Sequence, residues 1–220
     1  MKSLYIVGAG GFGREVLWLV KRINEASFFE GKGRGWKIEG FIDDNTELHE
    51  TMQDEYPVLG GCDYFNNILE EIYIIVAIGS AKVKRKVVNK LSRYKNIKFA
   101  TLIDPTAIVS DRVKIGAGCI ICAGTIVTVD IILGRNVIIN LDCTLGHDVM
   151  VGDYTTVYPS TNISGNVKID EEVELGTGVQ IIQGKNIGSQ SIIGAGAVVV
   201  KDIPKRCTAV GSPAKPIRFF

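Results

Sequence analysis

The 220-residue sequence predicts two domains of different class: an α/β Rossmann-like domain over residues 1–102 and an all-β parallel β-helix over residues 103–220. Two observations support this prediction. Near the N-terminus, a short apolar strand, a glycine-rich turn and a helical pattern follow one another. From Ile103 to Val199, every sixth residue is Ile, Val or Leu, without a break over 17 positions.

The first element is an apolar strand over residues 3–7, which ends in Gly8-Ala9-Gly10-Gly11-Phe12-Gly13. Apolar residues between Arg14 and Asn24 then recur at helical spacing. Glycines in such a turn let a phosphate approach the backbone N–H groups at the helix N-terminus. We therefore expect Gly10, Gly11 and Gly13 to bind a phosphate-bearing ligand, with a purely structural turn as the alternative.

Two further strands are predicted, over residues 36–42 and 73–78, and a basic amphipathic helix over residues 82–93. The segment 25–35 is predicted to be an exposed loop. Alternating strands and helices favour a parallel sheet, whose ligands bind at the carboxyl ends of the strands. This adds three residues to the expected ligand site: Asp43, Asp44 and Gly79.

A nucleotide or nucleotide sugar is the expected ligand of this domain. NAD is disfavoured because the acidic residue that would hold a ribose is expected ~20 residues after the glycine motif, whereas Asp43 comes 30 residues after Gly13. The basic residues Lys82, Lys84, Arg85 and Lys86 either face phosphates or form a solvated helix face.

A period of six residues fits the hexapeptide β-helix, in which three consecutive hexads form one triangular coil. The aliphatic residue of each hexad then points inward, and Val113 to Lys201 holds about five coils. The residue after the aliphatic position is often glycine, as at Gly116, Gly134 and Gly152. We attribute these glycines to corner conformations that only glycine adopts at low cost.

Composition excludes several classes of function. The net charge is +1 with no basic stripe, so nucleic-acid binding is not expected. No apolar run reaches the ~18 residues of a membrane span, and the N-terminal run is too short for a signal peptide, so a cytoplasmic protein is predicted. The five cysteines are an odd number, and Cys119-x-x-Cys122 is interpreted as filling small positions of the repeat, with no metal site.

The candidate catalytic residue is His147, because stacking of three-hexad coils places it between Val129 and Gly165. A histidine can take a proton from an attacking amine or hydroxyl, and the neighbouring Asp148 can fix its tautomer. The N–H of Gly165 could face the reacting carbonyl of a thioester. The alternative is that His147 is a solvated residue on the prism, as is expected for His49.

Five features of the sequence together resemble a family of bacterial sugar acetyltransferases. They are the six-residue repeat, the tail Val210–Lys215, the glycine-rich turn through Val16, the segment Gly40–Asp44 and Gly146-His147-Asp148. This family comprises enzymes of the sialic acid O-acetyltransferase and nucleotide-4-amino-sugar N-acetyltransferase type, within the hexapeptide-repeat acyltransferases. The resemblance covers the whole chain and implies a left-handed β-helix and acetyl-CoA as the co-substrate.

The resemblance also implies roles for individual residues. His147 would be the general base with Asp148, Asn140 would contact the acceptor and Gly165 would donate its N–H to the thioester. Coenzyme contacts are implied at Thr177, Ala195 and Lys215. Thr156 stands where some members carry a second histidine, which leaves the contact to the pantetheine open.

A flat prism face cannot enclose a ligand, so a site at His147 needs walls from another chain or from the N-terminal domain. We expect a homo-oligomer with active sites between subunits, and the resemblance implies a homotrimer. The expected reaction is acetyl transfer to an amine of a nucleotide-linked amino sugar, for surface glycan biosynthesis.

Four alternative functions are weighed against this one. Two stay open: O-acetylation of a sugar hydroxyl such as that of sialic acid, and a non-catalytic sugar-binding scaffold. A β-helix carbonic anhydrase is disfavoured because it needs three histidines and this chain has two. An NAD oxidoreductase is disfavoured by the spacing described above.

Overall fold

The computed structural model describes residues 1–29 and 35–220. The middle of the segment predicted to be an exposed loop therefore lies outside the described residues, while its first part, residues 25–29, is helical and corrects that prediction. The chain divides into two compact units: Met1–Gly79 with Val83–Pro105, and Ser80–Lys82 with Thr106–Phe220.

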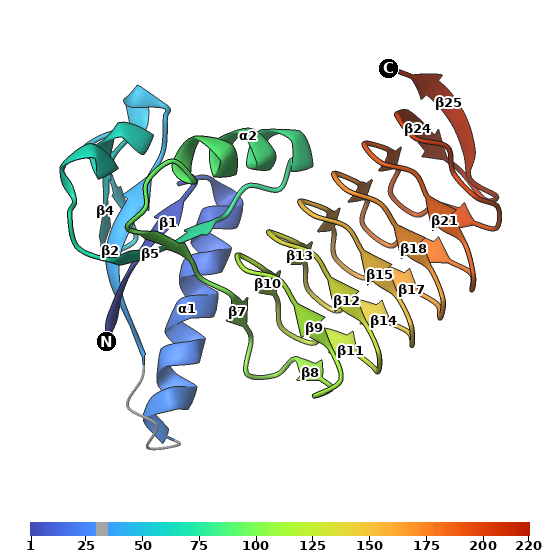
Figure 1. Cartoon of the computed structure of the whole chain (residues 1–220), viewed down its shortest axis with the longest axis horizontal. Coiled ribbons are helices and arrows are strands. Elements are labelled where there is room, and N and C mark those ends of the chain that lie inside the picture. The colour runs from blue at the N-terminus through green and yellow to red at the C-terminus, as the bar shows by residue number, and fades with distance from the viewer. Residues whose placement is uncertain (30–34) are drawn as a thin grey trace. The chain divides into compact units, whose positions relative to one another are not determined.

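The first unit contains a sheet with the strand order β3-β4-β2-β1-β5-β6 (Figure 1). Its strands are β1 (Lys2–Val7), β2 (Trp36–Ile42), β3 (Met52–Gln53), β4 (Tyr56–Gly60), β5 (Ile72–Val76) and β6 (Ile97–Phe99). All neighbouring strands are parallel except β3 and β4, which form an antiparallel pair. The predicted parallel sheet is thus present, but the sequence pattern predicted neither the β3–β4 pair nor β6.

Two α-helices connect these strands, α1 (Gly11–Phe29) and α2 (Ala81–Leu91), together with the short 3-10 turns Thr46–Leu48 and Cys62–Asn67. Helix α1 buries Val16, Leu17 and Val20 and packs along β1 and β2. It begins three residues earlier than predicted, because the Arg14 N–H already bonds the Gly10 carbonyl (3.2 Å) inside the glycine-rich turn.

Strand β1 lies at the centre of the sheet, where the chain reverses direction between the β2 side and the β5 side. Backbone hydrogen bonds join the carboxyl ends of these three strands, from Gly8 N–H to Ile42 (2.7 Å) and from Ala77 N–H to Val7 (2.8 Å). Open α/β sheets bind ligands at such a reversal. The fold therefore gathers the glycine-rich turn, Asp43 and Gly79 at one edge of the sheet.

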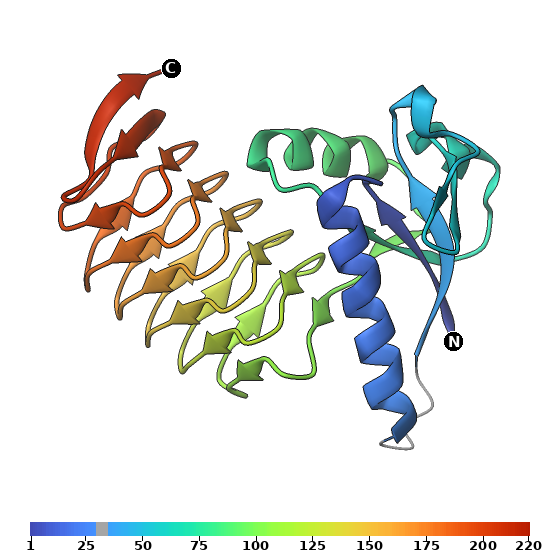
Figure 2. The ribbon, with the colours of Figure 1, turned by 180° about the vertical axis from the view of Figure 1, so that it is seen from behind.

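The second unit is a prism of stacked triangular coils (Figures 1 and 2), made of three parallel sheets. One sheet contains β10 (Ile120–Ile121), β13 (Ile138–Ile139), β16 (Thr156–Val157), β19 (Glu174–Leu175), β22 (Ile192–Ile193) and β24 (Cys207–Val210). Strand β25 (Lys215–Phe219) pairs antiparallel with β24 at the end of this sheet, and β7 (Leu102–Ile103) precedes these strands in the chain. The strands of the next sheet are β8 (Ile108–Val109), β11 (Ile126–Val127), β14 (Thr144–Leu145), β17 (Asn162–Ile163), β20 (Gln180–Ile181) and β23 (Val198–Val199). The strands of the third are β9 (Lys114–Ile115), β12 (Ile132–Leu133), β15 (Met150–Val151), β18 (Lys168–Ile169) and β21 (Asn186–Ile187).

Each strand pairs with the strand three hexads later, as in Ile120↔Ile138 and Ile132↔Met150. The second residue of each strand is the aliphatic residue of the six-residue pattern. From Ile121 to Val199 these side chains point into the prism and form one buried core. The period of six residues and the coil of three hexads are therefore confirmed.

The glycines that follow the aliphatic positions have a different role from the predicted one. The left-handed backbone conformation occurs two residues later, mostly at Asn, Asp or Gly, as at Asn136 (φ 55°) and Asp148 (φ 58°). A Cβ added to Gly176 would instead lie 2.6 Å from the Ala195 nitrogen of the next coil. Our attribution to corner conformation was wrong: glycine is needed here because the next coil passes too close for a side chain.

Candidate active site

His147 lies at the corner of the prism between β14 and β15. Its Nδ1 is 2.8 Å from Oδ2 of Asp148, and the two side chains are 59% and 53% exposed. The coil backbone holds this corner on both sides, since the Asp148 N–H donates to the Val129 carbonyl (3.1 Å) and the Asn166 N–H donates to the His147 carbonyl (2.9 Å). The imidazole is thus open to solvent on a rigid backbone.

Asp148 owes its orientation to the turn. Its φ of 58° places it in the left-handed region, which Asp and Asn enter more readily than most residues. This conformation turns its carboxylate back toward the preceding residue, His147. A carboxylate on Nδ1 favours the tautomer with a proton on Nδ1 and a free lone pair on Nε2, which is the form a general base needs.

The other side of the imidazole lies against Gly165, one coil further on. A Cβ added to Gly165 would lie 2.5 Å from Nε2 and 2.6 Å from Cε1 of His147. Any side chain at this position would therefore displace the ring. No acceptor for the Gly165 N–H is found within the described ranges 1–29 and 35–220, and Gly165 itself lies beside the basic nitrogen of His147.

Asn140 lies at a different corner, between β13 and β14. Its Oδ1 accepts from the Leu141 N–H (2.7 Å), its carbonyl accepts from the Thr125 hydroxyl (2.9 Å), and it is buried. One coil further along the same edge, the Tyr158 hydroxyl donates to Glu174 (3.4 Å). Burial and then the Glu174 carboxylate raise the pKa of Tyr158 to about 12, so its hydroxyl stays a donor at neutral pH.

The expected coenzyme contacts share the corner of Asn140, not that of His147. Thr177 and Ala195 are exposed and stack on successive coils, with the Gly196 N–H donating to the Thr177 carbonyl (2.8 Å). Lys215 is exposed at the start of β25, and Thr156 is buried. Within one chain, the structure brings His147 together with Gly165, and Asn140 together with the Thr177–Ala195 edge, but it does not join the two sets.

The sequence pattern did not predict the hydrogen-bonded pair Tyr158 and Glu174 next to the edge of Asn140. The signal was present, because Tyr158 is one coil after Asn140 and Glu174 is the outward residue of β19. Counting coils forward from Asn140 would have found Tyr158. Nothing in the local sequence marks Glu174.

The glycine-rich turn of the first unit is held by two close approaches. Gly8 has φ 106° and a Cβ there would lie 2.8 Å from the Ala77 carbonyl oxygen, while a Cβ at Gly13 would collide with the Gly8 carbonyl. A Cβ at Gly10 would meet open space, and one at Gly11 would lie 4.0 Å from the nearest atom, a guanidinium nitrogen of Arg14. Gly8 and Gly13 are therefore needed for the fold, whereas Gly10 and Gly11 form an exposed backbone at the start of α1.

The two aspartates after β2 have structural partners. Oδ2 of Asp43 accepts from the Ala9 N–H (2.8 Å) and so fixes the glycine-rich turn, while Oδ1 accepts from Asn45 (2.9 Å). Asp44 accepts from the Cys62 N–H (2.8 Å) and from Lys90 (3.0 Å). Burial alone would raise the pKa of Asp44, but these two hydrogen bonds outweigh it and hold that pKa below its usual value.

The described residues contain no group of three or more His, Cys, Asp or Glu side chains placed to hold a metal ion. All five cysteines are buried and none forms a disulfide, and Cys119 and Cys122 occupy positions of the repeat. None of the helices in the described part of the chain has the length and apolar character needed to cross a bilayer.

Comparisons with known proteins bear on the fold and the family of the chain. Residues 3–91 match the PglD N-terminal domain. The acetyltransferase domain of PglB from Neisseria gonorrhoeae FA1090 is 32% identical with a TM-score of 0.83, over 99% of this chain and 100% of that one. PerB from Caulobacter crescentus, solved with CoA and GDP-perosamine, is 27% identical with a TM-score of 0.85, over 99% and 98%.

Among curated sequences, UDP-N-acetylbacillosamine N-acetyltransferase from Bacillus subtilis is 32% identical over 125 residues, which is 56% of this chain and 52% of that protein. The chain thus aligns with about half of this relative, and with 20% and 21% of the lengths of two yeast proteins named as acetyltransferases.

The α/β unit followed by a left-handed parallel β-helix with a histidine at one corner defines a hexapeptide-repeat acyltransferase of two-domain type. Within that class, the chain belongs to the family of bacterial sugar acetyltransferases that includes the nucleotide-amino-sugar N-acetyltransferases.

Proposed function

We propose that this protein transfers the acetyl group of acetyl-CoA to an amine of a nucleotide-linked amino sugar, with His147 as the general base. The observation that carries the proposal is the corner at which Asp148 holds Nδ1 of His147 at 2.8 Å while Nε2 lies against Gly165. The choice of an amine is supported by the relatives, which are named as N-acetyltransferases acting on perosamine and on a bacillosamine derivative.

The reaction is a direct transfer. As the sugar amine attacks the thioester carbonyl, Nε2 of His147 takes the amine proton, and Asp148 stabilises the imidazolium that forms. The Gly165 N–H donates to the carbonyl oxygen as it becomes negative. When the C–S bond breaks, His147 returns the proton to the leaving sulfur, so no covalent enzyme intermediate is needed.

The first unit would hold the nucleotide part of the acceptor at the exposed N–H groups of Gly10 and Gly11, with Gly13, Gly79 and the aspartates Asp43 and Asp44 around them. A helix N-terminus favours phosphate groups because of its free N–H groups. The oxygens of Asp43 and Asp44 already accept hydrogen bonds from the chain, so we expect them to contact the ligand through their remaining lone pairs.

The complete site would lie between two chains of a homotrimer. Asn140, Thr177 and Ala195 lie at one corner of the prism, and His147 and Gly165 lie at the next. An acceptor and acetyl-CoA that contact both sets are accommodated when the first corner of one chain faces the second corner of another. Such a head-to-tail contact closes into a ring when its rotation allows. The product would serve surface glycan biosynthesis.

The test is a screen for coenzyme A release from acetyl-CoA with UDP-, dTDP-, GDP- and CMP-linked amino sugars, and with sialic acid as a hydroxyl acceptor. We expect release with one class of amino sugar, and mass spectrometry should find the acetyl group on nitrogen. Release only with the hydroxyl acceptor would replace the proposal by O-acetylation. No release with any acceptor, despite binding, would favour the sugar-binding scaffold.

A further inference from the structure

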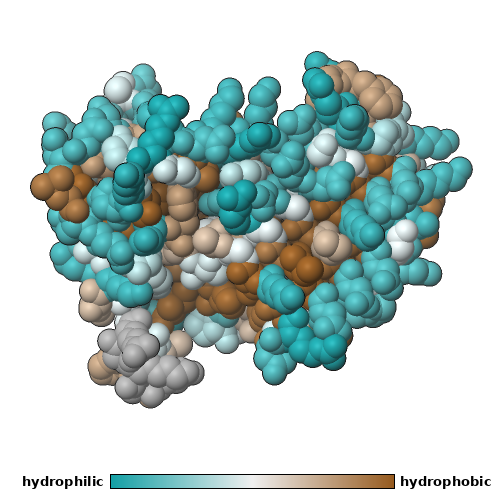
Figure 3. Space-filling model, in the orientation of Figure 1, coloured by the Kyte–Doolittle hydropathy of each residue, from teal (hydrophilic) through white to brown (hydrophobic). Residues whose placement is uncertain are grey.

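One face of the prism carries a pocket of about 430 Å³ that the proposed reaction does not use. It lies over β12, β15 and β18, where the outward side chains of Ile132 and Met150 are 40% and 44% exposed. A hydrophobic band runs along the coils on this side of the molecule in Figure 3. Apolar side chains gathered in a surface pocket are typical of an interaction site.

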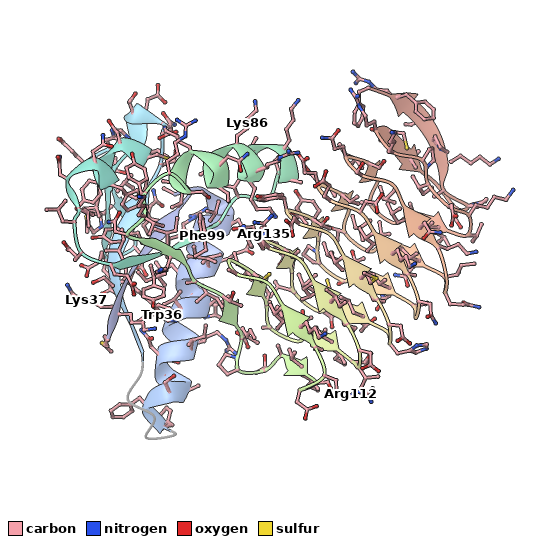
Figure 4. The ribbon with its side chains drawn as sticks, in the orientation of Figure 1. Trp36, Lys37, Lys86, Phe99, Arg112 and Arg135 are labelled. Carbon is pink, nitrogen blue, oxygen red and sulfur yellow. The ribbon has the colours of Figure 1, made fainter. Side chains whose placement is uncertain are left out.

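Of the charged side chains that line this pocket, one forms an ion pair and the others have no side-chain partner among the described residues. Asp153 is paired with Arg135 (2.6 Å), at one edge of the face in Figure 4. The carboxylates of Asp170 and Glu171 are exposed, and no side-chain partner for either is found in the described residues. Among the described residues that line this pocket, Lys168 is the cation, and no side-chain partner is found for it. The pocket therefore has an apolar wall and an excess of negative charge.

Helix α2 carries a surface of complementary character. Lys82, Val83 and Lys86 are exposed in its first two turns, and Figure 4 shows Lys86 extending away from the helix. Within the described ranges, no side-chain partner is found for Lys82 or Lys86, whereas Lys90 pairs with Asp44 (3.0 Å). Lys84 is buried, so the basic run seen in the sequence does not form one continuous face.

We propose that α2 of one copy docks into this pocket of a second copy of the chain, with Lys82 and Lys86 against Asp170 and Glu171 and with Val83 on Ile132 and Met150. Residues four apart on a helix lie about 5–6 Å from each other, so the two lysines can reach two adjacent carboxylates. Opposite charges set the register of such a contact, and the apolar pair adds buried area.

The contact joins two different surfaces, so each copy offers both a helix and a pocket. Strand β15, in the middle of the pocket, begins two residues after Asp148. A docked helix would therefore bring a second copy next to the exposed imidazole of His147. This supplies a wall that one prism face lacks, whichever acceptor the enzyme uses.

Charge reversal tests the contact in the full-length protein. We expect Lys82→Glu with Lys86→Glu, and separately Asp170→Lys with Glu171→Lys, to weaken self-association at least tenfold in sedimentation velocity. The combined fourfold variant should recover it, and so should a mixture of the two double variants, because each then offers the surface that the other needs. Circular dichroism checks that all variants are folded.

The matched control is Lys37→Glu with Lys98→Glu, which changes the charge equally at exposed lysines that already have acidic neighbours. It should leave self-association unchanged. A monomeric wild-type protein, unchanged association of both double variants, or a fourfold variant that stays dissociated would each overturn the proposal. A raised KM for the nucleotide sugar with unchanged association would assign the lysines to substrate binding instead.

Discussion

The chemistry proposed at His147 depends on two residues that act in different ways. Asp148 contributes a carboxylate, which the left-handed turn directs at Nδ1 (2.8 Å). Gly165 contributes the absence of a side chain, which leaves room for the ring beside the backbone of the next coil. The position of the Asp148 carboxylate and the space left by Gly165 are therefore as important for catalysis as the identity of the base.

Replacing His147→Asn removes the base and keeps a polar side chain of similar size. We expect kcat for acetyl transfer to fall by about 10²–10⁴, the usual contribution of general base catalysis. The measurement is coenzyme A release at saturating substrates. Because the residue is exposed, thermal unfolding should be unchanged. A kcat within twofold of the wild-type value would remove His147 from the mechanism.

Replacing Gly165→Ala leaves the base in place but moves it. The new methyl group would lie 2.5 Å from the wild-type position of Nε2, so the imidazole has to rotate away from the Gly165 N–H. We expect kcat to fall at least tenfold with little change in stability. The control is Ser164→Ala, one residue earlier and exposed. Equal activity of both variants would contradict the placement of the ring.

At the scale of the element, each coil is shaped by close backbone approach on one side and a left-handed turn on the other. In one corner, Gly176 meets the requirement for close approach and Gly178 meets the requirement for the left-handed turn. A Cβ at Gly176 would lie 2.6 Å from the Ala195 nitrogen, whereas Gly178 has φ 73° and nothing within 4 Å of an added Cβ. One position excludes a side chain, and the other selects a backbone conformation.

The pair of variants Gly176→Asn and Gly178→Asn therefore has unequal expected effects. Asparagine tolerates the left-handed region, so Gly178→Asn should change the free energy of unfolding by less than about 1 kcal/mol. Gly176→Asn forces two coils apart and should cost about 1–3 kcal/mol, as overpacking does. Urea unfolding measures both. The reverse order would mean that conformation, not space, selects the glycine after each strand.

Burial also controls the reactivity of the cysteines, of which Cys62 lies in the first unit and the other four in the second. Burial raises the pKa of the Cys143 thiol to about 11, and burial followed by the Asp44 charge does the same for Cys62. A raised thiol pKa lowers the fraction of reactive thiolate at pH 8. We expect the native protein to react slowly with a thiol reagent and the unfolded protein to show five thiols. Fast reaction of the native protein would show that at least one of the two units opens.

The whole prism could be predicted from the sequence, because a repeat of six residues is a property of every coil. The position of His147 beside Gly165 followed from the same count. The pair β3–β4 and the strand β6 could not be predicted, because they are short and are held by tertiary pairing, not by a local pattern. The partners of Asp43 and Asp44 were also out of reach, since the Ala9 and Cys62 N–H groups approach them only in the folded sheet.

At the scale of the whole molecule, an ion pair between a half-buried arginine and a buried aspartate stabilises the end of the first unit. Arg22 on α1 forms two hydrogen bonds with Asp104 (2.7 and 3.0 Å), whose side chain is 1% exposed. Asp104 directly precedes Pro105, the last residue of this unit. The pair holds the exit of the chain against the first helix.

Replacing Arg22→Ala leaves the buried Asp104 carboxylate without this partner. Breaking a fully buried pair costs about 3–5 kcal/mol, and because Arg22 is partly exposed we expect a cost near or below the lower end of that range. Lys21→Ala, which removes exposed pairs with Asp54 and Glu55, should cost less than about 1 kcal/mol. Thermal unfolding of the two neighbouring variants measures the difference. Similar effects would mean that Asp104 is satisfied by other groups.

The pairing of each coil with the next makes the prism behave like a one-dimensional lattice whose unit is a coil about 4.8 Å high. Inserting one whole coil beyond Gly184 would lengthen the lattice by one unit and leave the His147 corner unchanged. Inserting a single residue would move every later side chain to a neighbouring column. Natural variation in length is therefore expected to come in whole coils or in loops that project from corners, because other changes misalign everything that follows.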